Sequence, residues 1–323
     1  MSKVVPPSWI FSLPLHGVRL LQSAEIDQLD YDSEYVESIK LYFSEYFAPT
    51  QQGPIWRLST QGERYSSVIE LFDVPTGKLL HIECQGTGSF QYQGNEINVS
   101  WQDGGTGFEH YLQTIGLSLW LEMRGMLCIH ANAIKTERGV IGIIAPSQTG
   151  KTTLTAALAM RGMGMMSDDM MAMHTTAEGP KVFPGWPQMR MWPEVARHFV
   201  QDVDSLQRVH HRFEKRIVES GAQNELRFSS KSGLLKRLYL LDRTDRIDSE
   251  VRIEALSASE SMLVLLQNSM LADAYRPLNI EKNRLSRLAS TLEFVEIKRI
   301  TYPSGKEHLV NVCENIEADV NTI

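Results

Sequence analysis

The sequence predicts an α/β protein in which a β-rich N-terminal module precedes a larger domain of strands and helices. Between residues 54 and 101, short runs of apolar and β-branched residues are separated by turn residues, a pattern typical of strands. Further along, an apolar run at 140–144 leads through a polar loop into a helical pattern that begins at Lys151. The chain has 323 residues, enough for two units of roughly 150 residues each. We place the module at residues 1–110 and the second domain at residues 111–323.

The composition excludes several classes of protein. With 42% hydrophobic and 22% charged residues, general disorder is excluded. The 32 Lys and Arg residues against 39 Asp and Glu residues give a net charge of −7, which argues against partners such as nucleic acid or anionic membranes. Three widely spaced cysteines fit a reducing compartment better than a disulfide framework. No apolar run reaches about 18 residues and early prolines interrupt the N-terminus, so we expect a cytoplasmic protein without a membrane span.

The N-terminal module is expected to begin with a helix and continue as strands. The helix is placed over residues 34–47. Turn signals such as Pro75-Thr76-Gly77 then separate the apolar runs that follow. These runs predict five strands, at residues 55–59, 67–72, 79–83, 89–92 and 97–101.

The second domain is expected to open with a helix over residues 109–123, which Gly125 would end. A hairpin, a helix and a strand follow, at residues 127–134 with 139–144, at 151–161, and at 164–167. Residues 183–187 read as a loop. The remaining expected elements are helices at 195–206 and 259–272, strands at 235–241 and 251–256, and a final hairpin of 293–301 with 307–312.

Residues 145–152, with the sequence APSQTGKT, fit a loose Walker A pattern in which Ala145 replaces the first glycine. Such a loop surrounds phosphate oxygens with backbone N–H groups, and Gly150 permits the tight turn into the following helix. Lys151 would place its charge on the β- and γ-phosphates, and the Thr152 hydroxyl would bind Mg²⁺. We therefore predict nucleotide contacts from Ala145, Ser147, Gln148, Thr149, Gly150, Lys151, Thr152 and Thr153.

An acid pair, Asp168-Asp169, follows a short predicted strand 17 residues after Lys151. At that place one carboxylate can hold Mg²⁺ and the other can accept a proton from an attacking hydroxyl. We assign Asp169, with Thr152, to the metal. His130, on the first strand of the hairpin, can orient an aspartate base or share its proton. The alternatives are a solvated acidic turn for the pair and a core histidine for His130.

These motifs resemble a known family. The order of Ile129-His130-Ala131, a hairpin, the loop at 145–152, Arg161-Gly162 and Ser167-Asp168-Asp169 resembles the C-terminal catalytic domain of HPr kinase/phosphorylase. It is more similar to the HPr-kinase-related serine kinases, which include lasso-peptide precursor kinases. The hairpin before the loop is also similar to the phosphoenolpyruvate-carboxykinase-like fold of that family. The close match covers residues 127–175.

The resemblance implies an ATP- and Mg²⁺-dependent kinase that phosphorylates a serine hydroxyl of a protein or peptide. It gives His130 the role of the catalytic histidine, Lys151 that of the loop lysine, Thr152 that of a metal ligand and Asp168 that of the proton acceptor. The chain departs from the family after the acid pair, where the Glu-(Ile/Val)-Arg-Gly-x-Gly signature is replaced by residues 183–192. The resemblance therefore leaves three of the family's properties open for this chain: the second metal-binding Glu, the reverse phosphorylase reaction and HPr as the substrate.

Several assignments stay open. Arg190 would either stabilise charge in the transition state or pack over Trp186 or Trp192. Glu194 is a candidate for the missing second metal ligand. The basic run at 208–216 is read as a solvated helix face, with a dock for phosphates or an acidic partner as the alternative.

The acceptor is also open. A small hydroxylated metabolite could replace the peptide, or the chain could be a non-catalytic nucleotide-dependent switch. The N-terminal module is the candidate for recognising a peptide substrate, by adding it as a strand to a sheet edge. Homo-oligomerisation is left open.

Overall fold

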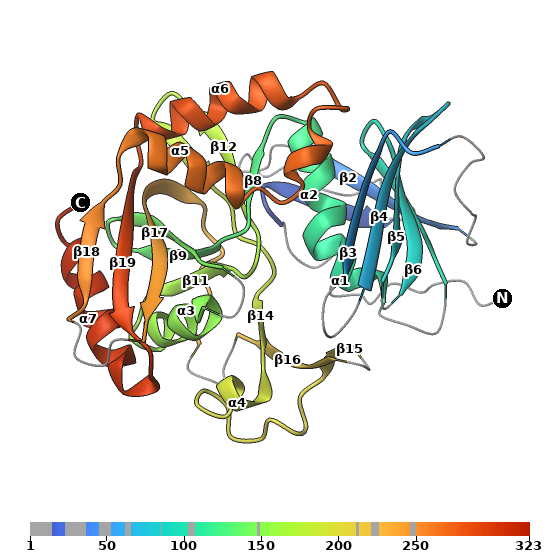
Figure 1. Cartoon of the computed structure of the whole chain (residues 1–323). Coiled ribbons are helices and arrows are strands. Elements are labelled where there is room, and N and C mark those ends of the chain that lie inside the picture. Colours follow the sequence, from blue (N-terminus) through green and yellow to red (C-terminus); the bar gives the residue numbers. More distant parts are fainter. Residues whose placement is uncertain are drawn as a thin grey trace.

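The computed structural model describes residues 15–22, 37–44, 53–61, 66–84, 86–102, 107–146, 149–210, 213–220, 226–245 and 250–323. Within them the protein is a mixed α/β fold with two large sheets and one small sheet (Figure 1). No helix in these stretches is long and apolar enough to cross a membrane.

The N-terminal sheet has seven strands in the order β1-β2-β7-β6-β5-β4-β3. They are β1 (Val18–Gln22), β2 (Glu37–Ser44), β3 (Trp56–Gln61), β4 (Ser66–Val74), β5 (Gly77–Glu83), β6 (Thr87–Gln93) and β7 (Glu96–Trp101). Strands β3 to β7 confirm the five expected between residues 55 and 101, and each pairs antiparallel with the next. The region is therefore β-rich, as predicted, whereas a domain boundary at residue 110 stays a prediction.

The helix expected over residues 34–47 is wrong, because the described part of that segment is strand β2. Ile39 and Leu41 are fully buried, while Lys40 and Tyr42 between and after them are partly exposed. This alternation has the period of a strand. Strand β2 pairs with β7 in parallel, so pairing with a distant segment makes these residues a strand rather than a helix.

The helix expected at 109–123 is confirmed as one continuous helical segment, and it packs on the N-terminal sheet. It consists of α1 (Phe108–Tyr111), the π-helical turn η2 (Leu112–Gly116) and α2 (Leu117–Met123). The Trp120 indole donates to the carbonyl of Gly94 across 2.9 Å, and the Tyr92 hydroxyl donates to that of Gly116 across 2.8 Å. Gly125, with φ +88°, follows the end of the helix in a left-handed conformation.

The central sheet has nine strands, in the order β11-β9-β10-β17-β13-β12-β8, with β19 also beside β17 and β18 beside β19. They are β8 (Leu127–Ile129), β9 (Asn132–Thr136), β10 (Gly139–Ile144), β11 (Gly164–Ser167), β12 (Met171–Thr176), β13 (Gly179–Val182), β17 (Gly233–Thr244), β18 (Arg252–Ala255) and β19 (Glu296–Pro303). Strand β17 runs parallel to both β10 and β19. The carboxyl ends of these three strands therefore meet at one edge of the sheet.

Helices cover both faces of the central sheet. Helices α3 (Lys151–Met160) and α7 (Leu309–Val320) pack with Ile141 and Ile143 of β10. Helices α5 (Ala258–Gln267) and α6 (Glu281–Leu292) pack with Val140 and Ile144 of the same strand. Since alternate residues of β10 reach opposite layers, the strand is buried on both faces, as its apolar sequence requires.

Three other expectations are corrected. Residues 307–312 belong to a short 3₁₀ turn and the first turns of α7, because apolar residues three and four apart continue to Val320 and bury one helical face. The helix expected at 195–206 is reduced to α4 (Pro193–Ala196). The strand expected at 127–134 is split at residues 130–131, and its halves pair with different partners, β12 and β10.

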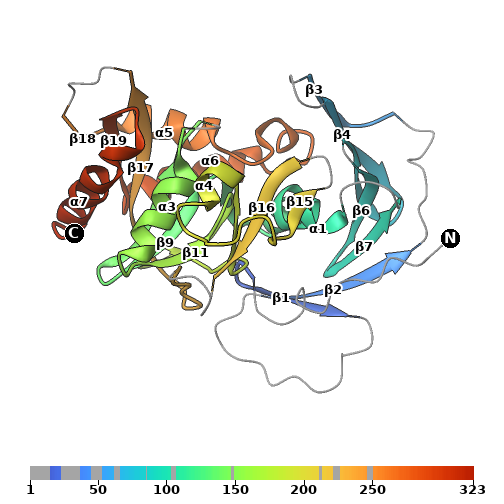
Figure 2. The ribbon, with the colours of Figure 1, turned by 90° about the horizontal axis from the view of Figure 1, so that it is seen from below.

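The basic run at 208–216 is not a helix face. Its described residues, 208–210 and 213–216, lie in a small sheet of β14 (Gln188–Met191), β16 (Phe213–Glu219) and β15 (Arg208–His210), in the order β14-β16-β15. This sheet lies between α3 and α1 in two views (Figures 1 and 2).

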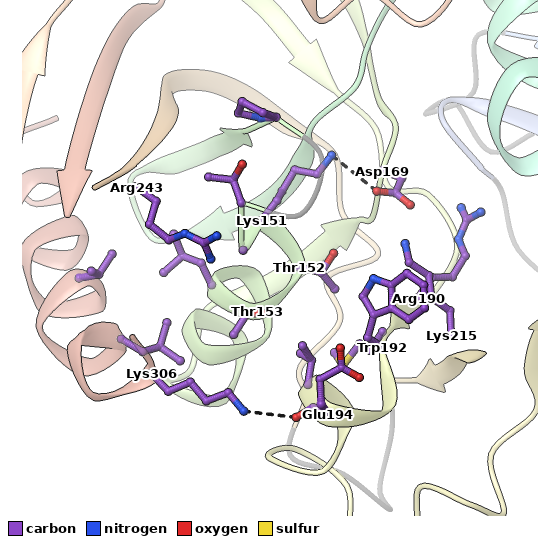
Figure 3. Close-up of a pocket in the computed structure, with 18 of the residues that line it drawn as sticks. Lys151, Thr152, Thr153, Asp169, Arg190, Trp192, Glu194, Lys215, Arg243 and Lys306 are labelled. Atoms are coloured by element: carbon purple, nitrogen blue, oxygen red, sulfur yellow. Dashed lines mark hydrogen bonds and ion pairs between the residues drawn. The ribbon is translucent and has the colours of Figure 1, made fainter. Parts of the chain in front are cut away.

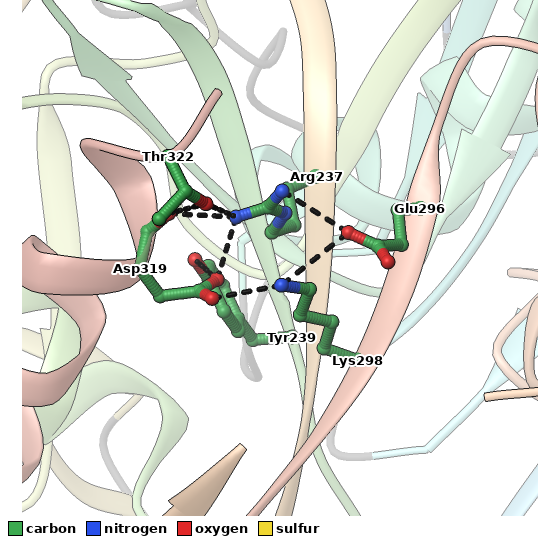
Figure 4. Close-up of polar contacts among 6 residues, drawn as sticks. All are labelled: Arg237, Tyr239, Glu296, Lys298, Asp319 and Thr322. Carbon is green, nitrogen blue, oxygen red and sulfur yellow. Dashed lines mark hydrogen bonds and ion pairs between the residues drawn. The ribbon is translucent and has the colours of Figure 1, made fainter. Parts of the chain in front are cut away.

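A polar network joins the end of α7 to the central sheet (Figure 4). The Asp319 carboxylate accepts hydrogen bonds from Arg237 and Tyr239 across 2.7 Å each and from Lys298 across 2.8 Å. Arg237 also pairs with Glu296 at 3.0 Å. The network lies toward the beginning of β17 and β19, away from the edge where their carboxyl ends meet.

Candidate active site

Strand β10 ends at Ile144 and α3 begins at Lys151, so residues 145–150 form a strand–loop–helix connection as the motif predicts. Gly150 immediately precedes the helix with φ +101°, a conformation that side-chain-bearing residues rarely adopt. The first N–H groups of α3, at residues 151–153, have no partner within the helix. Together these features give the geometry needed to hold an anion.

The connecting loop is fixed at Thr149. Its N–H donates to the Pro146 carbonyl across 3.3 Å, and its carbonyl accepts from the Tyr302 hydroxyl across 3.0 Å. Ala145, which follows the last residue of β10, is 1% exposed and is not among the residues that line the cavity described below. Ser147 and Gln148, both predicted nucleotide contacts, lie outside the described residues.

A cavity of about 670 Å³ opens around the beginning of α3 (Figure 3). The other predicted contacts at Thr149, Gly150, Lys151, Thr152 and Thr153 line it. The described charged side chains of its lining are five cationic residues, Lys151, Arg190, Lys215, Arg243 and Lys306, and two carboxylates, Asp169 and Glu194.

Lys151, His130 and Asp169 converge in this cavity. The Lys151 ammonium lies 3.0 Å from Nε2 of His130 and 3.5 Å from a carboxylate oxygen of Asp169. Nδ1 of His130 lies 2.9 Å from the carbonyl oxygen of Asp169. Since an ammonium can only donate, Nε2 accepts and Nδ1–H donates, which fixes one neutral tautomer.

The electrostatics agree with this arrangement. Burial, followed by the Lys151 charge, lowers the pKa of His130 and so keeps the ring neutral. Burial also lowers the pKa of Lys151. For Asp169, burial acts to raise the pKa, but the charges of Lys151 and Arg190 outweigh it and hold the pKa below its ordinary value. Asp169 therefore stays ionised.

Asp168 faces different partners. One carboxylate oxygen accepts from the Arg190 backbone N–H across 2.8 Å, and the other lies 3.4 Å from the Thr152 hydroxyl, which donates to it. Burial and the adjacent Asp169 charge raise the pKa of Asp168 above its ordinary value. Asp169 is among the residues that line the cavity and Asp168 is not. The structure thus brings Thr152 to Asp168, whereas the sequence paired Thr152 with Asp169.

Asn132 joins the acid pair to α3, a role that no sequence signal indicated. Its side-chain oxygen accepts from the Asp169 N–H across 2.9 Å, and its amide donates to the Thr155 hydroxyl across 3.0 Å. That hydroxyl donates to the Lys151 carbonyl across 2.9 Å. Asp169 has φ +64°, unusual for a residue other than glycine, and the fully buried Asn132 helps to hold it there.

The small sheet supplies the wall beside Asp169. Arg190, on β14, is 6% exposed, and its guanidinium lies 2.9 Å from Nδ1 of His110. The cation that lies over the Trp192 ring is Lys215, at 5.8 Å from the centroid. Figure 3 shows Arg190, Trp192 and Lys215 together on the Asp169 side of the cavity.

The other end of the cavity lies beyond Thr153. Arg243, at the end of β17, and Lys306, just after β19, lie there (Figure 3). The Lys306 ammonium is 3.5 Å from the carbonyl of Glu194, whose residue also lines the cavity. The two ends therefore have different chemistry: one holds Asp169 and His130, and the other holds Arg243 and Lys306 with Glu194 beside them.

Fold and site together define an α/β protein with a cationic cavity at a strand–loop–helix junction. No protein-family model matches the sequence, and no curated protein matches it. Among solved structures, the chain is similar to the HPr(Ser) kinase/phosphatase from Coxiella burnetii, at 13% identity and a TM-score of 0.31. The match covers 60% of this chain and 98% of that one. A likeness this loose does not establish the function of this chain.

Proposed function

We propose that this protein is a kinase that uses ATP and Mg²⁺ to phosphorylate a serine hydroxyl of a protein or peptide. The observation that carries the proposal is the charge of the cavity. In a chain of net charge −7, five cationic side chains and two carboxylates surround the beginning of α3. Such a site favours a polyanion, and a loop of the Walker A type makes a nucleoside triphosphate the best candidate.

The residues fit both ATP and Mg²⁺. The loop at 145–150 and the first N–H groups of α3 would hold the phosphates, with Lys151 as their counter-charge. The hydroxyl of Thr152 and the carboxylate of Asp168, already in contact, offer the hard oxygen ligands that Mg²⁺ prefers. Bound Mg²⁺ would neutralise part of the phosphate charge.

In the proposed reaction the serine oxygen bonds to the γ-phosphorus, and the bond from that phosphorus to the β–γ bridging oxygen breaks. The serine proton passes to an aspartate, and ADP leaves. We propose Asp169 as the acceptor of this proton, because it faces the cavity and Lys151 holds it in the ionised form. Asp168 would then serve the metal with Thr152. This exchanges the roles that the sequence predicts for the two acids.

His130 would act through its neighbours. Its ring accepts from Lys151 and donates to the Asp169 carbonyl, so it fixes the position of both groups. Arg190 would place positive charge beside the acids, because its backbone N–H binds Asp168 and its guanidinium lies in the cavity wall.

A peptide acceptor is supported by the N-terminal sheet. Its edge strand β3 is exposed along five of its six residues, so a peptide could pair with it. We propose residues 1–110 as the part that presents the substrate to the catalytic domain at 111–323.

The proposal is tested by incubating the purified chain with γ-labelled ATP, Mg²⁺ and serine-containing peptides. We expect label on peptide serine, and none with Lys151→Met. Label on small hydroxylated compounds but on no peptide would support a metabolite kinase instead. ATP binding without transfer to any acceptor would support a nucleotide-dependent switch.

A further inference from the structure

Lys215 lies in the cavity although it belongs to the basic run expected to face solvent. It is on β16, which pairs antiparallel with β14 so that Ile217 lies opposite Arg190 and Arg216 opposite Met191. This pairing brings Lys215 next to Trp192, and its ammonium lies over that ring at 5.8 Å. The side chain is half-buried and lines the cavity.

The other cations on this side of the cavity have partners in the structure. Lys151 pairs with Asp169, and the Arg190 guanidinium contacts His110. No carboxylate of the described residues lies within ion-pair distance of the Lys215 ammonium, whose neighbour is the Trp192 ring. An aromatic face attracts a cation but does not neutralise it. Among the described residues, Lys215 is therefore a half-buried cation of the cavity without a directly paired carboxylate.

The charge of Lys215 acts on the proposed reaction centre. It helps to lower the pKa values of His130, Lys151 and Asp169, although burial and the charges of other residues have larger effects on these groups. Arg243 and Lys306 lie at the opposite end of the cavity, beyond Thr153 (Figure 3). Lys215 thus belongs to the end where phosphoryl transfer would occur.

We propose that Lys215 binds the terminal phosphoryl group of the nucleotide from the side opposite Lys151. This inference rests on the proposed function and adds to it a catalytic residue from the small sheet. A lysine ammonium is a compact point charge, suited to a phosphoryl group whose oxygens carry growing charge during transfer. Trp192 would hold the flexible side chain in place.

Binding of ATP compared with ADP tests the proposal, since ADP lacks the group that Lys215 would hold. Calorimetric titrations with Mg²⁺ would compare the wild-type chain with Lys215→Met and Lys215→Arg. The matched control is Lys181→Met: Lys181, on β13, is also part-buried with its ammonium 5.6 Å from an aromatic ring, that of Phe183, but it does not line the cavity.

We expect Lys215→Met to weaken ATP binding about tenfold while ADP binding changes little. Lys215→Arg should keep most of the ATP affinity, and Lys181→Met should change neither. If Lys215→Met weakened ATP and ADP binding equally, or left ATP binding unchanged, the proposal would be overturned. If ATP binding were unchanged and only the phosphorylation of acidic peptides became poorer, Lys215 would be assigned to the acceptor instead. If the wild-type chain bound neither nucleotide, the proposed function itself would fail. Circular dichroism would confirm that each variant is folded.

Discussion

The backbone N–H of Asp169 donates to the side chain of Asn132 across 2.9 Å, and this bond links the acid pair to the nucleotide loop. Through Thr155 the same asparagine reaches the carbonyl of Lys151. The positions of the candidate base and the candidate phosphate-binding lysine therefore depend on one buried amide.

Replacing Asn132 with Ala should slow phosphoryl transfer more than it weakens nucleotide binding. The change leaves the Asp169 N–H without its acceptor and removes the donor to the Thr155 hydroxyl, so we expect a stability loss of about 1–3 kcal/mol. Transfer should fall at least about tenfold, because Asp169 loses support for its left-handed backbone. Asn315→Ala, which removes bonds within α7, is the control and should leave transfer unchanged. Transfer at the wild-type rate in Asn132→Ala would contradict this role.

Variants of Asp168 and Asp169 should differ in how their rate of phosphoryl transfer depends on the Mg²⁺ concentration. Since Asp168 contacts Thr152, Asp168→Asn should raise the Mg²⁺ concentration needed for half-maximal transfer. Asp169→Asn should abolish transfer at every Mg²⁺ concentration, because the proton acceptor is lost. The reverse pattern would restore the roles predicted from the sequence. Initial rates across a Mg²⁺ titration provide the measurement.

His16 should make stability fall in acid. Burial lowers its pKa to about 3 from an ordinary 6.5. The unfolded chain therefore takes up a proton near pH 6.5 while the folded chain does not, so this contribution is complete above that pH and is lost as the pH falls toward 3.

Urea unfolding of the wild-type chain and of His16→Asn at pH 7 and pH 4.5 measures this effect. Asparagine tolerates the left-handed backbone at this position, where φ is +54°. We expect the wild type to lose on the order of 2 kcal/mol more than the variant between the two pH values. Equal losses would show that His16 is not titrating as its burial requires.

The network at Asp319 should matter more for stability than a salt bridge nearby on the same helix. Asp319→Ala leaves Arg237, Lys298 and the Tyr239 hydroxyl without their shared acceptor (Figure 4), and we expect a loss of about 2 kcal/mol, since the group is only partly buried. Glu317→Ala removes a partly exposed pair with Arg161 and should cost less than about 1 kcal/mol. Free energies of unfolding from denaturant curves would decide, and equal losses would refute the comparison.

Local patterns in the sequence were enough to predict the strands β3 to β7 and the β10–α3 junction. Alternation, turn residues and the Gly-Lys-Thr step are all local signals. The family resemblance assigned both His130 and Lys151 to one site, and the structure brings Nε2 of His130 and the Lys151 ammonium to 3.0 Å from each other. Local sequence patterns did not decide which of Asp168 and Asp169 accepts the proton and which binds the metal.

The failures share a different cause. Strand β2 and helix α7 depend on which distant segment buries their apolar face, and a short sequence window does not contain that information. Asn132 and Lys215 belong to no recognisable motif. Their roles can be inferred only once the fold places Asn132 beside Asp169 and Lys215 beside Trp192. The run at 208–216 was interpreted as a solvated helix face, with a dock for phosphates or an acidic partner as the alternative, and the pattern did not distinguish Lys215 from its basic neighbours.

The central claim is that the cavity at the beginning of α3 binds a nucleoside triphosphate. Calorimetric titration of the purified chain with ATP and Mg²⁺ tests it most directly. We predict saturable binding at one site per chain, weakened more than about tenfold by Lys151→Met. No detectable binding of ATP or any other nucleoside triphosphate by the folded wild-type chain would contradict the account.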